Sequence, residues 1–306
     1  MGAPFSTWLH AFRLRTLPLA VSSIIVGSAL AVPDSRISAA STFRLEVLLL
    51  ALLTAILLQI LSNLANDLGD HLHGTDNAAR IGPQRAVQSG SIPPAAMKRA
   101  MLLCGVLAFG SGVALIISAL GIRLMTLVFL LVGLLAIGAA VKYTFGRNPY
   151  GYAGLGDVSV FLFFGIVGVM GTHYLHARTI EWMHLLPAAG FGLLSAGVLN
   201  VNNMRDIRND KASGKITLAV RLGPDDAKSY HGLLIIGGLT CLMLFTALNF
   251  RGMPQWGFLV TTSVLASHLR VVLRNHDHAA LDPELKRLAL ATFATAIAFA
   301  VGLWLV

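Results

Sequence analysis

Long apolar segments separated by short polar ones run through the whole chain. Crossing the hydrocarbon core of a bilayer as an α-helix takes roughly 20 residues, and the apolar runs approach that length. We expect about nine crossings, at 17–32, 46–62, 101–120, 123–141, 157–175, 185–201, 232–250, 256–273 and 288–306. The pattern predicts an all-α polytopic membrane protein.

The composition supports this fold class. Of 306 residues, 56% are hydrophobic and 12% are charged, whereas a soluble domain averages about 25% charged residues. We expect one integral membrane domain over residues 1–306. Cys104 and Cys241 both lie inside apolar runs, so we interpret them as packing residues and not as a disulfide or a metal pair.

The net charge of +9 could indicate a nucleic-acid partner, but the positions of the basic residues explain it better. With a cytoplasmic N-terminus, most of the 23 lysines and arginines fall on the cytoplasmic side. The exceptions are Arg36, Arg44, Arg123, Arg178 and Arg251. This positive-inside pattern predicts a multi-pass protein of the cell inner membrane with an external C-terminus, and no nucleic-acid partner.

The first apolar run has a second interpretation. Arg13 and Arg15 before it, with Ala29 and Ala31 at its end, also fit a cleavable signal peptide. The many later spans favour an uncleaved signal anchor, and cleavage would leave the later topology unchanged.

Acids and asparagines gather where the second apolar run ends. Asn63, Asp67 and Asp70 are spaced i, i+4 and i+7, so they share one face if the helix continues. Asn66 and Asp76 lie in the same stretch. Ionisable groups near membrane depth are costly, which makes this stretch a candidate functional site.

A second polar stretch closes the sixth apolar run. Asn202, Asp206 and Asp210 are spaced i, i+4 and i+8, and Asn202 and Asp206 each follow Asn63 and Asp67 by 139 positions. The chain therefore resembles a diverged duplication. Two carboxylate faces that meet in space would form an oxygen-rich site for Mg²⁺, which also takes phosphate oxygens as ligands.

Basic and aromatic residues accompany both stretches. Arg80 and Arg85 lie in a Gly-Pro turn beside the acids, where anion binding is slightly favoured over a role as membrane anchors. Tyr143, next to Lys142, is either an interfacial residue or a π face for a reactive cation. Lys211, Lys215 and Arg221, within and after the second stretch, are interpreted as phosphate-binding or membrane-surface cations.

Two weaker signals are set aside. Gly214-Lys215-Ile216-Thr217 resembles part of a nucleotide-binding loop, but position 209 is Asn where that motif needs Gly, and no strand precedes it. The His276-Asp277-His278 triplet is typical of a solvated loop more than of a metal site.

The paired motifs resemble those of the UbiA superfamily of intramembrane aromatic prenyltransferases. The first family motif, N-D-x-x-D-x-x-x-D, matches at Asn66, Asp67 and Asp70 but ends on Gly74. The second, D-x-x-x-D, is complete at Asp206 and Asp210. Within the superfamily, the sequence most resembles the 1,4-dihydroxy-2-naphthoate polyprenyltransferase branch. The matching segments include Arg15-Thr-Leu-Pro18, Lys142-Tyr143-Thr144 and Asn202-Asn203-Met204-Arg205.

The resemblance implies a nine-helix fold with a cytoplasm-facing cavity that opens to lipid. It implies Mg²⁺-dependent transfer from a polyprenyl diphosphate to 1,4-dihydroxy-2-naphthoate with decarboxylation, giving demethylmenaquinone. The metal ligands would be Asp67, Asp70, Asp206 and Asp210, with Asp76 in addition. Orientation and diphosphate contacts would come from Asn63, Asn66, Arg80, Arg85, Lys142, Asn202, Asn203, Arg205 and Lys211, and Tyr143 would face the allylic cation.

Two alternatives stay open at this point. Another branch of the superfamily would accept 4-hydroxybenzoate, homogentisate or a haem vinyl group. A secondary transporter also fits duplicated membrane halves with polar motifs, although here the acids cluster at one surface and not at the midplane.

Overall fold

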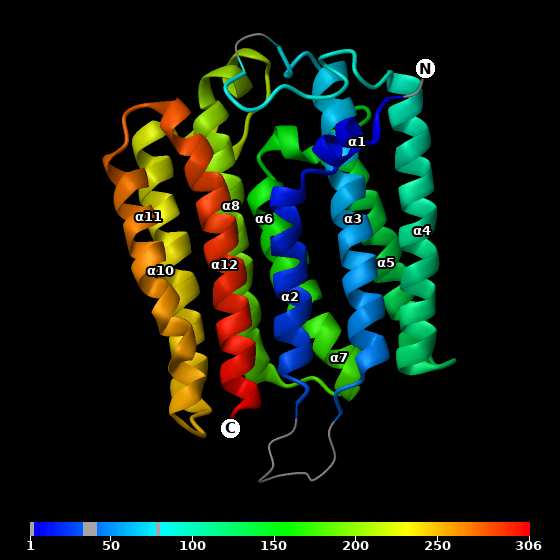
Figure 1. Cartoon of the computed structure of the whole chain (residues 1–306), viewed down its shortest axis with the longest axis vertical. Helices are drawn as coiled ribbons and strands as arrows, with labels where there is room; N and C mark the ends of the chain where they lie inside the picture. The colour runs from blue at the N-terminus through cyan, green and yellow to red at the C-terminus, as the bar shows by residue number, and fades with distance from the viewer. Residues whose placement is uncertain (1–2, 33–41, 78–79) are drawn as a thin grey trace.

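The computed structural model of the chain describes residues 3–32, 42–77 and 80–306, and the regular elements within these ranges are all helical. Nine helical segments of this described part are long and apolar enough to cross a membrane. They stand side by side in one elongated bundle (Figure 1). The predicted all-α polytopic fold is confirmed.

The elements follow one another with connections of different length, and the loop from α3 to α4 is the longest within the described residues. The first part of the chain forms α1 (Phe5–Phe12), η1 (Leu14–Thr16), α2 (Leu17–Ala29), α3 (Leu45–Leu72), α4 (Pro94–Leu120) and α5 (Leu124–Lys142). The remainder forms η2 (Tyr150–Ala153), α6 (Gly156–Val160), η3 (Phe161–Gly171), α7 (Thr172–Ala177), η4 (Trp182–His184), α8 (Leu185–Ala212), α9 (Leu218–Leu222), α10 (Pro224–Leu248), η5 (Met253–Thr261), α11 (Thr262–Arg274), η6 (His278–Ala280) and α12 (Leu281–Trp304).

Two helices continue well beyond the apolar runs that predicted them. The second and sixth spans were expected at 46–62 and 185–201, but α3 reaches Leu72 and α8 reaches Ala212. Both polar motifs are therefore helical, and their C-terminal ends lie at the same end of the bundle (Figure 1), which we call the motif end. Hydropathy falls before the helix stops, because these last turns pack against protein and not lipid.

The N-terminal segment adds a helix that the apolar pattern did not predict. α1 lies across the motif end (Figure 1) and contacts α3 before the chain turns into α2. Arg13 makes this turn in the left-handed region, with φ 51°. The side chain of Arg13 thereby lines the main cavity of the bundle, which is described below.

The fifth span changes helix type within the membrane. It starts as α6, continues as the π-helical η3 and ends as α7. π-helical turns are rare and often occur at functional sites. Here Ser23 of α2 donates a hydrogen bond to the Phe164 carbonyl of η3, and η3 forms one wall of the main cavity.

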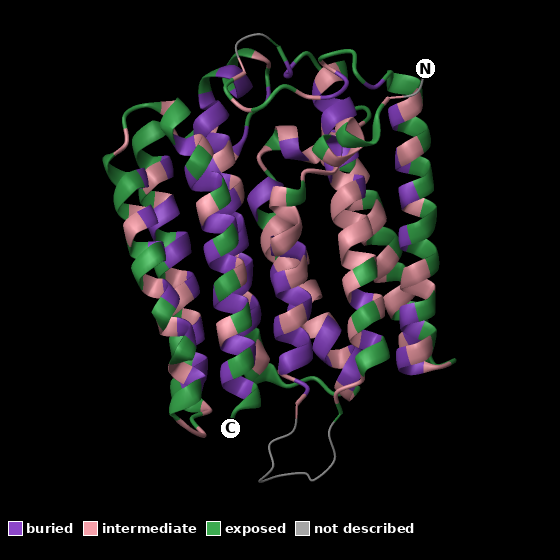
Figure 2. Ribbon diagram, viewed as in Figure 1, coloured by how far each residue is buried: buried purple, intermediate pink, exposed green. Residues whose placement is uncertain are grey.

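Burial distinguishes central helices from peripheral ones. Figure 2 shows buried residues concentrated along α8 and α12, whereas α4, α10 and α11 carry many exposed residues. Leu127, Leu131 and Leu135 of α5 are exposed leucines of the kind that contact lipid. At the motif end, Ala86 and Val87 pack into a core cluster with α3 and α4, which fixes the loop between those helices.

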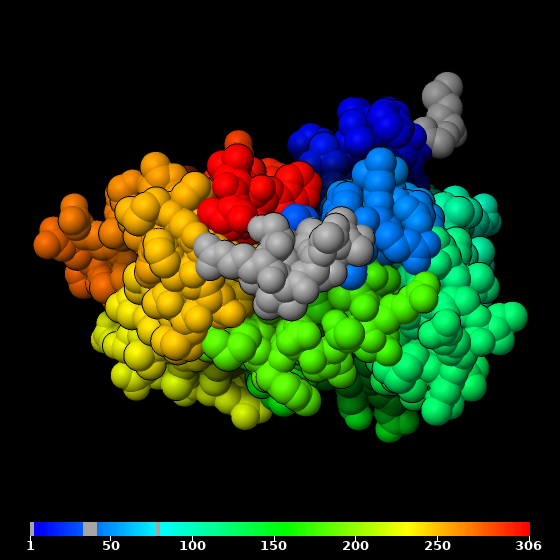
Figure 3. Space-filling model, turned by 90° about the horizontal axis from the view of Figure 1, so that it is seen from below, coloured from blue at the N-terminus to red at the C-terminus, as the bar shows by residue number. Residues whose placement is uncertain are grey.

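The opposite end of the bundle carries the C-terminus. Figure 3 shows this end, with the last turn of α12 beside the connection between α10 and η5. Contact there is close, since a Cβ atom on Gly302 would lie 2.5 Å from the Pro254 carbonyl oxygen. The N-terminal segment is at the motif end, as an odd number of described crossings requires.

Candidate functional site

The two polar motifs meet at the motif end. The Lys215 ammonium lies 3.6 Å from Asp70 and 3.8 Å from Asp210, and so joins the carboxylates of α3 and α8. Asn209 of α8 donates a 2.8 Å hydrogen bond to the Thr75 carbonyl just after α3. We expected the acidic faces of the two motifs to meet in space, and the folded chain brings them together.

Asp70 lies at the centre of this group. Its carboxylate accepts hydrogen bonds from Arg85 at 3.1 Å and from the Tyr152 hydroxyl at 2.9 Å. The Lys215 ammonium also lies over the Tyr152 ring, 5.4 Å from its centre. Burial acts to lower the pKa of Lys215, but Asp70 and Asp210 outweigh it and hold that pKa above its ordinary value.

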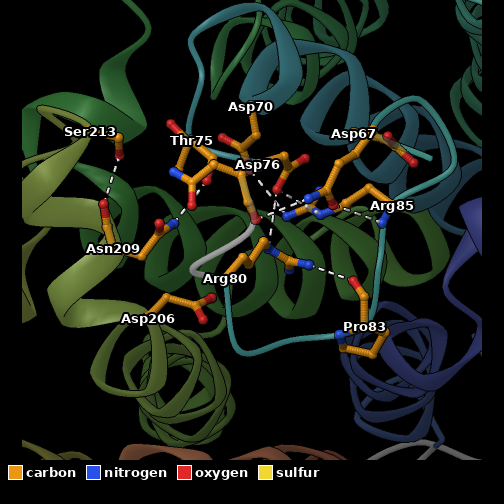
Figure 4. Close-up of polar contacts among 12 residues, drawn as sticks. Asp67, Asp70, Thr75, Asp76, Arg80, Pro83, Arg85, Asp206, Asn209 and Ser213 are labelled. Carbon is orange, nitrogen blue, oxygen red and sulfur yellow. Dashed lines mark hydrogen bonds and ion pairs between the residues drawn. The ribbon is translucent and has the colours of Figure 1, made fainter. Parts of the chain in front are cut away.

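Asp76 lies beside Asp70 within a small ion network (Figure 4). Its carboxylate is 3.1 Å from Arg80 Nε and 3.5 Å from Arg85 Nε. Burial, and secondly the charge of Asp70, raise the pKa of Asp76 to about 7, although Arg80 opposes the shift. Asp76 thus joins the acids of the motif even though the motif spacing places Gly74 where the family has an acid.

Asp67 has a different environment. Its two oxygens accept hydrogen bonds from the backbone N–H groups of Ala86 and Val87, both at 3.1 Å. Asp67 is 1% exposed and does not line the main cavity. It therefore anchors the loop that carries Arg80 and Arg85.

Arg205 organises the α8 side of the site. Its guanidinium donates to both oxygens of Asp206, at 3.0 and 2.6 Å, and to Asp282 of α12 at 2.5 Å. A further bond of 3.1 Å reaches the Asn202 side chain. Gly82 lies directly over this group, because a Cβ atom there would be 2.8 Å from Arg205 Nη2.

A cavity of about 370 Å³ extends from the site into the membrane-spanning part of the bundle. Its polar end is lined by Asp70, Arg85, Asn202 and Lys215, with Asn63 and Asn66 beside them. Further in, the walls are apolar and include Leu115, Ile116, Phe129, Phe163 and Phe164. The cavity thus combines a charged end with apolar walls in one space.

Two tyrosines line the cavity close to its polar end. The rings of Tyr143 and Tyr150 meet edge to face, with centres 5.4 Å apart. The Tyr150 hydroxyl is held by the Ala139 carbonyl at 3.0 Å and by Ser159 at 2.9 Å. Aromatic faces of this kind attract cations.

The asparagines of the first motif form hydrogen bonds with the segments that lie next to α3. Asn63 donates to the Phe12 carbonyl at 2.9 Å and to Thr16 at 3.0 Å, which ties α3 to the N-terminal segment. Asn66 accepts a 2.8 Å bond from Thr144. Both residues line the cavity, as expected for groups that orient a ligand.

Nine of the expected site residues do not line this cavity. Six of them belong to the polar network beside it, namely Asp67, Asp76, Arg80, Arg205, Asp206 and Asp210. The other three are Lys142, Asn203 and Lys211. Lys142 is exposed and donates to the carbonyl of Arg147 in its own loop. Lys211 is exposed on the outer side of α8, and Asn203 is buried without lining the cavity. The amino-acid sequence of a loop and its charge do not by themselves show which way a side chain points.

Three residues in the site were not among the expected ones, and a fourth, Lys215, was expected only as a phosphate-binding or membrane-surface cation. Arg13 and Arg15 line the polar end, although the charge pattern explains them as membrane anchors. Tyr152 and Lys215 contact Asp70 directly. Tyr152 and Lys215 lie in glycine-rich loop segments that the sequence singled out. Helical periodicity does not apply to loops, so it could not show which way these two side chains point.

The oxygen atoms of the site suit Mg²⁺ when a diphosphate completes the ligand set. No three of the described His, Cys, Asp and Glu side chains converge closely enough to hold an ion alone. Mg²⁺ is usually bound by one or two carboxylates, waters and substrate phosphates. Oδ2 of Asp76, Oδ2 of Asp210 and Oδ1 of Asn209 are buried and have no hydrogen-bond partner, so oxygen ligands are available.

Comparisons with known proteins give relatives over almost the whole chain. The chain is 46% identical over 298 residues to the 1,4-dihydroxy-2-naphthoate octaprenyltransferase of Escherichia coli (strain K12), covering 97% of this chain and 95% of that protein. It is 42% identical to the Haemophilus influenzae protein of the same name, with the same two coverages. It is 40% identical to the Mycobacterium tuberculosis protein of that name, covering 80% of each chain.

Solved structures share the fold. A UbiA homologue from Aeropyrum pernix K1, in its apo form, is similar with a TM-score of 0.68 at 16% identity, covering 96% of this chain and 98% of that one. A UbiA homologue from Archaeoglobus fulgidus bound to DMAPP and Mg²⁺ has a TM-score of 0.60 at 15% identity, covering 96% and 99%. The UbiA prenyltransferase family itself matches residues 20–295. With two joined acidic motifs above an apolar cavity, this chain belongs to the UbiA prenyltransferase family.

Proposed function

We propose that the protein transfers a polyprenyl group from a polyprenyl diphosphate to 1,4-dihydroxy-2-naphthoate with loss of carbon dioxide. The observation that carries the proposal is a cavity with carboxylates and cations at one end and apolar walls beyond. It occurs in a chain that is 46% identical to an octaprenyltransferase acting on this acceptor. The family defines the reaction type, and the relatives' shared acceptor indicates the substrate.

The donor's diphosphate fits the polar end of the cavity. Arg13, Arg85 and Lys215 line it and offer charged donors to phosphate oxygens. Asp70, Asp76 and Asp210 are the carboxylates best placed to hold Mg²⁺, with Asp67 and Asp206 contributing charge behind them. When bound, Mg²⁺ would neutralise the diphosphate and make it a better leaving group.

The chain's own residues then favour cleavage of the allylic carbon–oxygen bond. The electron pair leaves with the diphosphate, and the charge that develops there faces Arg13, Arg85 and Lys215. The allylic cation that remains faces Tyr143 and Tyr150 and the apolar wall, which exclude water. A tail of isoprene units extends along the phenylalanines of η3.

The acceptor completes the reaction by carbon attack. The electron-rich ring carbon that bears the carboxylate forms a bond to the allylic carbon. The carboxylate then leaves as carbon dioxide, and its bonding electrons restore the aromatic ring. The product is a prenylated naphthohydroquinone, the reduced form of demethylmenaquinone.

We place the motif end on the cytoplasmic side of the cell inner membrane. Most lysines and arginines lie in the segments at this end, including Arg80, Arg85 and Arg208. Basic residues are retained on the cytoplasmic side during insertion. The naphthoate would then reach the site from the cytoplasm, and the donor from the membrane with its diphosphate at the cytoplasmic side.

Product analysis tests the proposal directly. Purified protein is mixed with Mg²⁺, octaprenyl diphosphate, 1,4-dihydroxy-2-naphthoate and 4-hydroxybenzoate in one tube, and products are identified by mass spectrometry. We expect a decarboxylated prenyl-naphthohydroquinone or its quinone. Prenylated hydroxybenzoate as the main product would contradict the acceptor assignment, and no prenylated product would contradict the reaction.

A further inference from the structure

A second cavity lies at the motif end, on the other side of α8 from the first. It has a volume of about 190 Å³ and lies between the last turns of α8, the start of α10, and the connection from α11 to α12. Its floor is apolar, with Ile207, Val272 and Leu281 among its lining residues. Asp206 and Arg208 are two positions apart on one helix, so they face opposite sides of α8.

The rest of the lining is mainly basic. Arg208, Lys228, His276 and His278 all line this cavity, and Asp225 is its one acidic lining residue. These residues come from α8, α10 and the segment before α12. Side chains from three separate parts of the chain thus converge on one small space.

The positive charges in this cavity are weakly compensated. Arg208 forms no ion pair with any carboxylate in the described part of the chain. Lys228 is 3.3 Å from Asp225, but that aspartate side chain is 94% exposed. A pair in which one partner is almost fully hydrated is worth little, so Lys228 can exchange Asp225 for another anion at small cost.

His278 provides an additional polar group. Its Nδ1 lies 3.0 Å from the Met204 carbonyl oxygen. Because a carbonyl can only accept, Nδ1 carries a proton, and Nε2 of the neutral ring is an acceptor for a hydroxyl group of a monohydrogen phosphate or a lipid headgroup. The contact also fixes the ring against the last turns of α8.

We propose that this second cavity binds a phosphate group between Arg208, Lys228 and His278. Basic pockets between membrane helices on the cytoplasmic side are known binding sites for phospholipid headgroups. The same chemistry fits the phosphate of an anionic lipid or free phosphate from the cytoplasm. An occupant would connect α8, which carries the second acidic motif, to α10 and to the segment before α12.

The test compares two double variants with the same change in charge. Arg208→Gln with Lys228→Gln removes the two cations of the cavity. Arg270→Gln with Lys286→Gln removes two exposed cations of the same end that do not line it. Size-exclusion profiles and melting temperatures in detergent show that each variant is folded, and Arg208→Gln alone replaces the first double variant if that one does not fold.

Native mass spectrometry measures the retention of phosphatidylglycerol against phosphatidylcholine. Thermal melting in sodium phosphate against sodium chloride at equal ionic strength measures free phosphate. We expect wild type and the Arg270/Lys286 variant to bind alike, and the Arg208/Lys228 variant to bind more weakly by about fivefold for each cation removed.

The two arms identify the source. If only the Arg208/Lys228 variant loses retention of phosphatidylglycerol, the site binds a lipid phosphate. If only this variant loses the shift in melting temperature caused by phosphate, the site binds the free anion. Equal losses in both double variants would show diffuse surface charge and overturn the proposal. Unchanged binding in the Arg208/Lys228 variant would overturn it as well.

Discussion

Four carboxylates at the motif end each have a cation within 4 Å. Arg85 lies 3.1 Å from Asp70, Arg80 3.1 Å from Asp76, Arg205 2.6 Å from Asp206 and Lys215 3.8 Å from Asp210. Buried charges without partners are strongly destabilising. If donor and Mg²⁺ enter together, as we propose, the cations would pair with phosphate and the carboxylates with metal, so the charges would be compensated in both states.

Arg13 is the clearest single test of donor binding. It lines the polar end of the cavity, and its Nη2 is buried without a hydrogen-bond partner. We expect Arg13→Gln to lower kcat/KM for the polyprenyl diphosphate by about 10²-fold, the loss typical of a donor to transition-state charge. Steady-state kinetics with varied donor concentration measure the effect.

The matched control is Arg99→Gln on the exposed surface of α4. It removes the same charge from the same end of the bundle and should leave kcat/KM unchanged. If Arg13→Gln and wild type have equal kcat/KM, Arg13 does not contribute to binding of the donor.

The loop between α3 and α4 is positioned by contacts from both halves of the chain. Asp67 of α3 holds the backbone at Ala86 and Val87, and Arg205 of α8 lies beneath Gly82. The loop in turn presents Arg80 and Arg85 to Asp76. Arg80 and Arg85, which we propose face the diphosphate, are thus held in place without a ligand.

Asp67→Asn tests the anchoring role apart from metal binding. The amide is neutral, and its NH₂ group would face a backbone N–H where a carboxylate oxygen now accepts a bond. We expect faster hydrogen exchange at residues 80–92 in the absence of Mg²⁺, because an unmade buried bond costs about 1–3 kcal/mol. Asp226→Asn, at an exposed position on α10, is the control. Wild-type exchange in Mg²⁺-free Asp67→Asn would leave Asp67 without an anchoring role.

Gly82→Ala tests the close contact between the loop and α8. Its methyl group would lie 2.8 Å from Arg205 Nη2, and Arg205 cannot easily move because it is bound to Asp206 and Asp282. The loop should shift and reduce kcat about tenfold or more, as small displacements of catalytic groups do. Gly138→Ala on α5, where a Cβ atom meets nothing within 4 Å, should keep full activity. Full activity in Gly82→Ala would show that the loop tolerates displacement.

Across the whole molecule, the parts that follow from periodicity were predictable. Nine apolar runs predicted the crossings, and equal spacings in Asn63/Asp67 and Asn202/Asp206 predicted two faces at one end of the bundle. The helical extension to Leu72 and Ala212 was not predicted, because polar turns there are stabilised by packing that hydropathy does not record.

The remaining differences have similar causes. The π-helical η3 packs against α2 and α8, and the apolar pattern of its sequence does not distinguish a π-helix from an α-helix. Arg13 enters the cavity because α1 folds across the motif end, and Lys142 stays outside because its ammonium bonds to its own loop. Side-chain direction in loops depends on tertiary contacts, so charge and spacing alone could not assign these two cations.

The central claim is that both halves of the chain form one Mg²⁺-diphosphate site. Isothermal titration of an unreactive polyprenyl thiolodiphosphate, with and without Mg²⁺, tests it in wild type, Asp70→Asn and Asp210→Asn, with Asp226→Asn as control. If the claim holds, binding in wild type and the control requires Mg²⁺, and either motif variant alone abolishes it. Mg²⁺-dependent binding of wild-type strength in Asp70→Asn or Asp210→Asn would contradict a shared site.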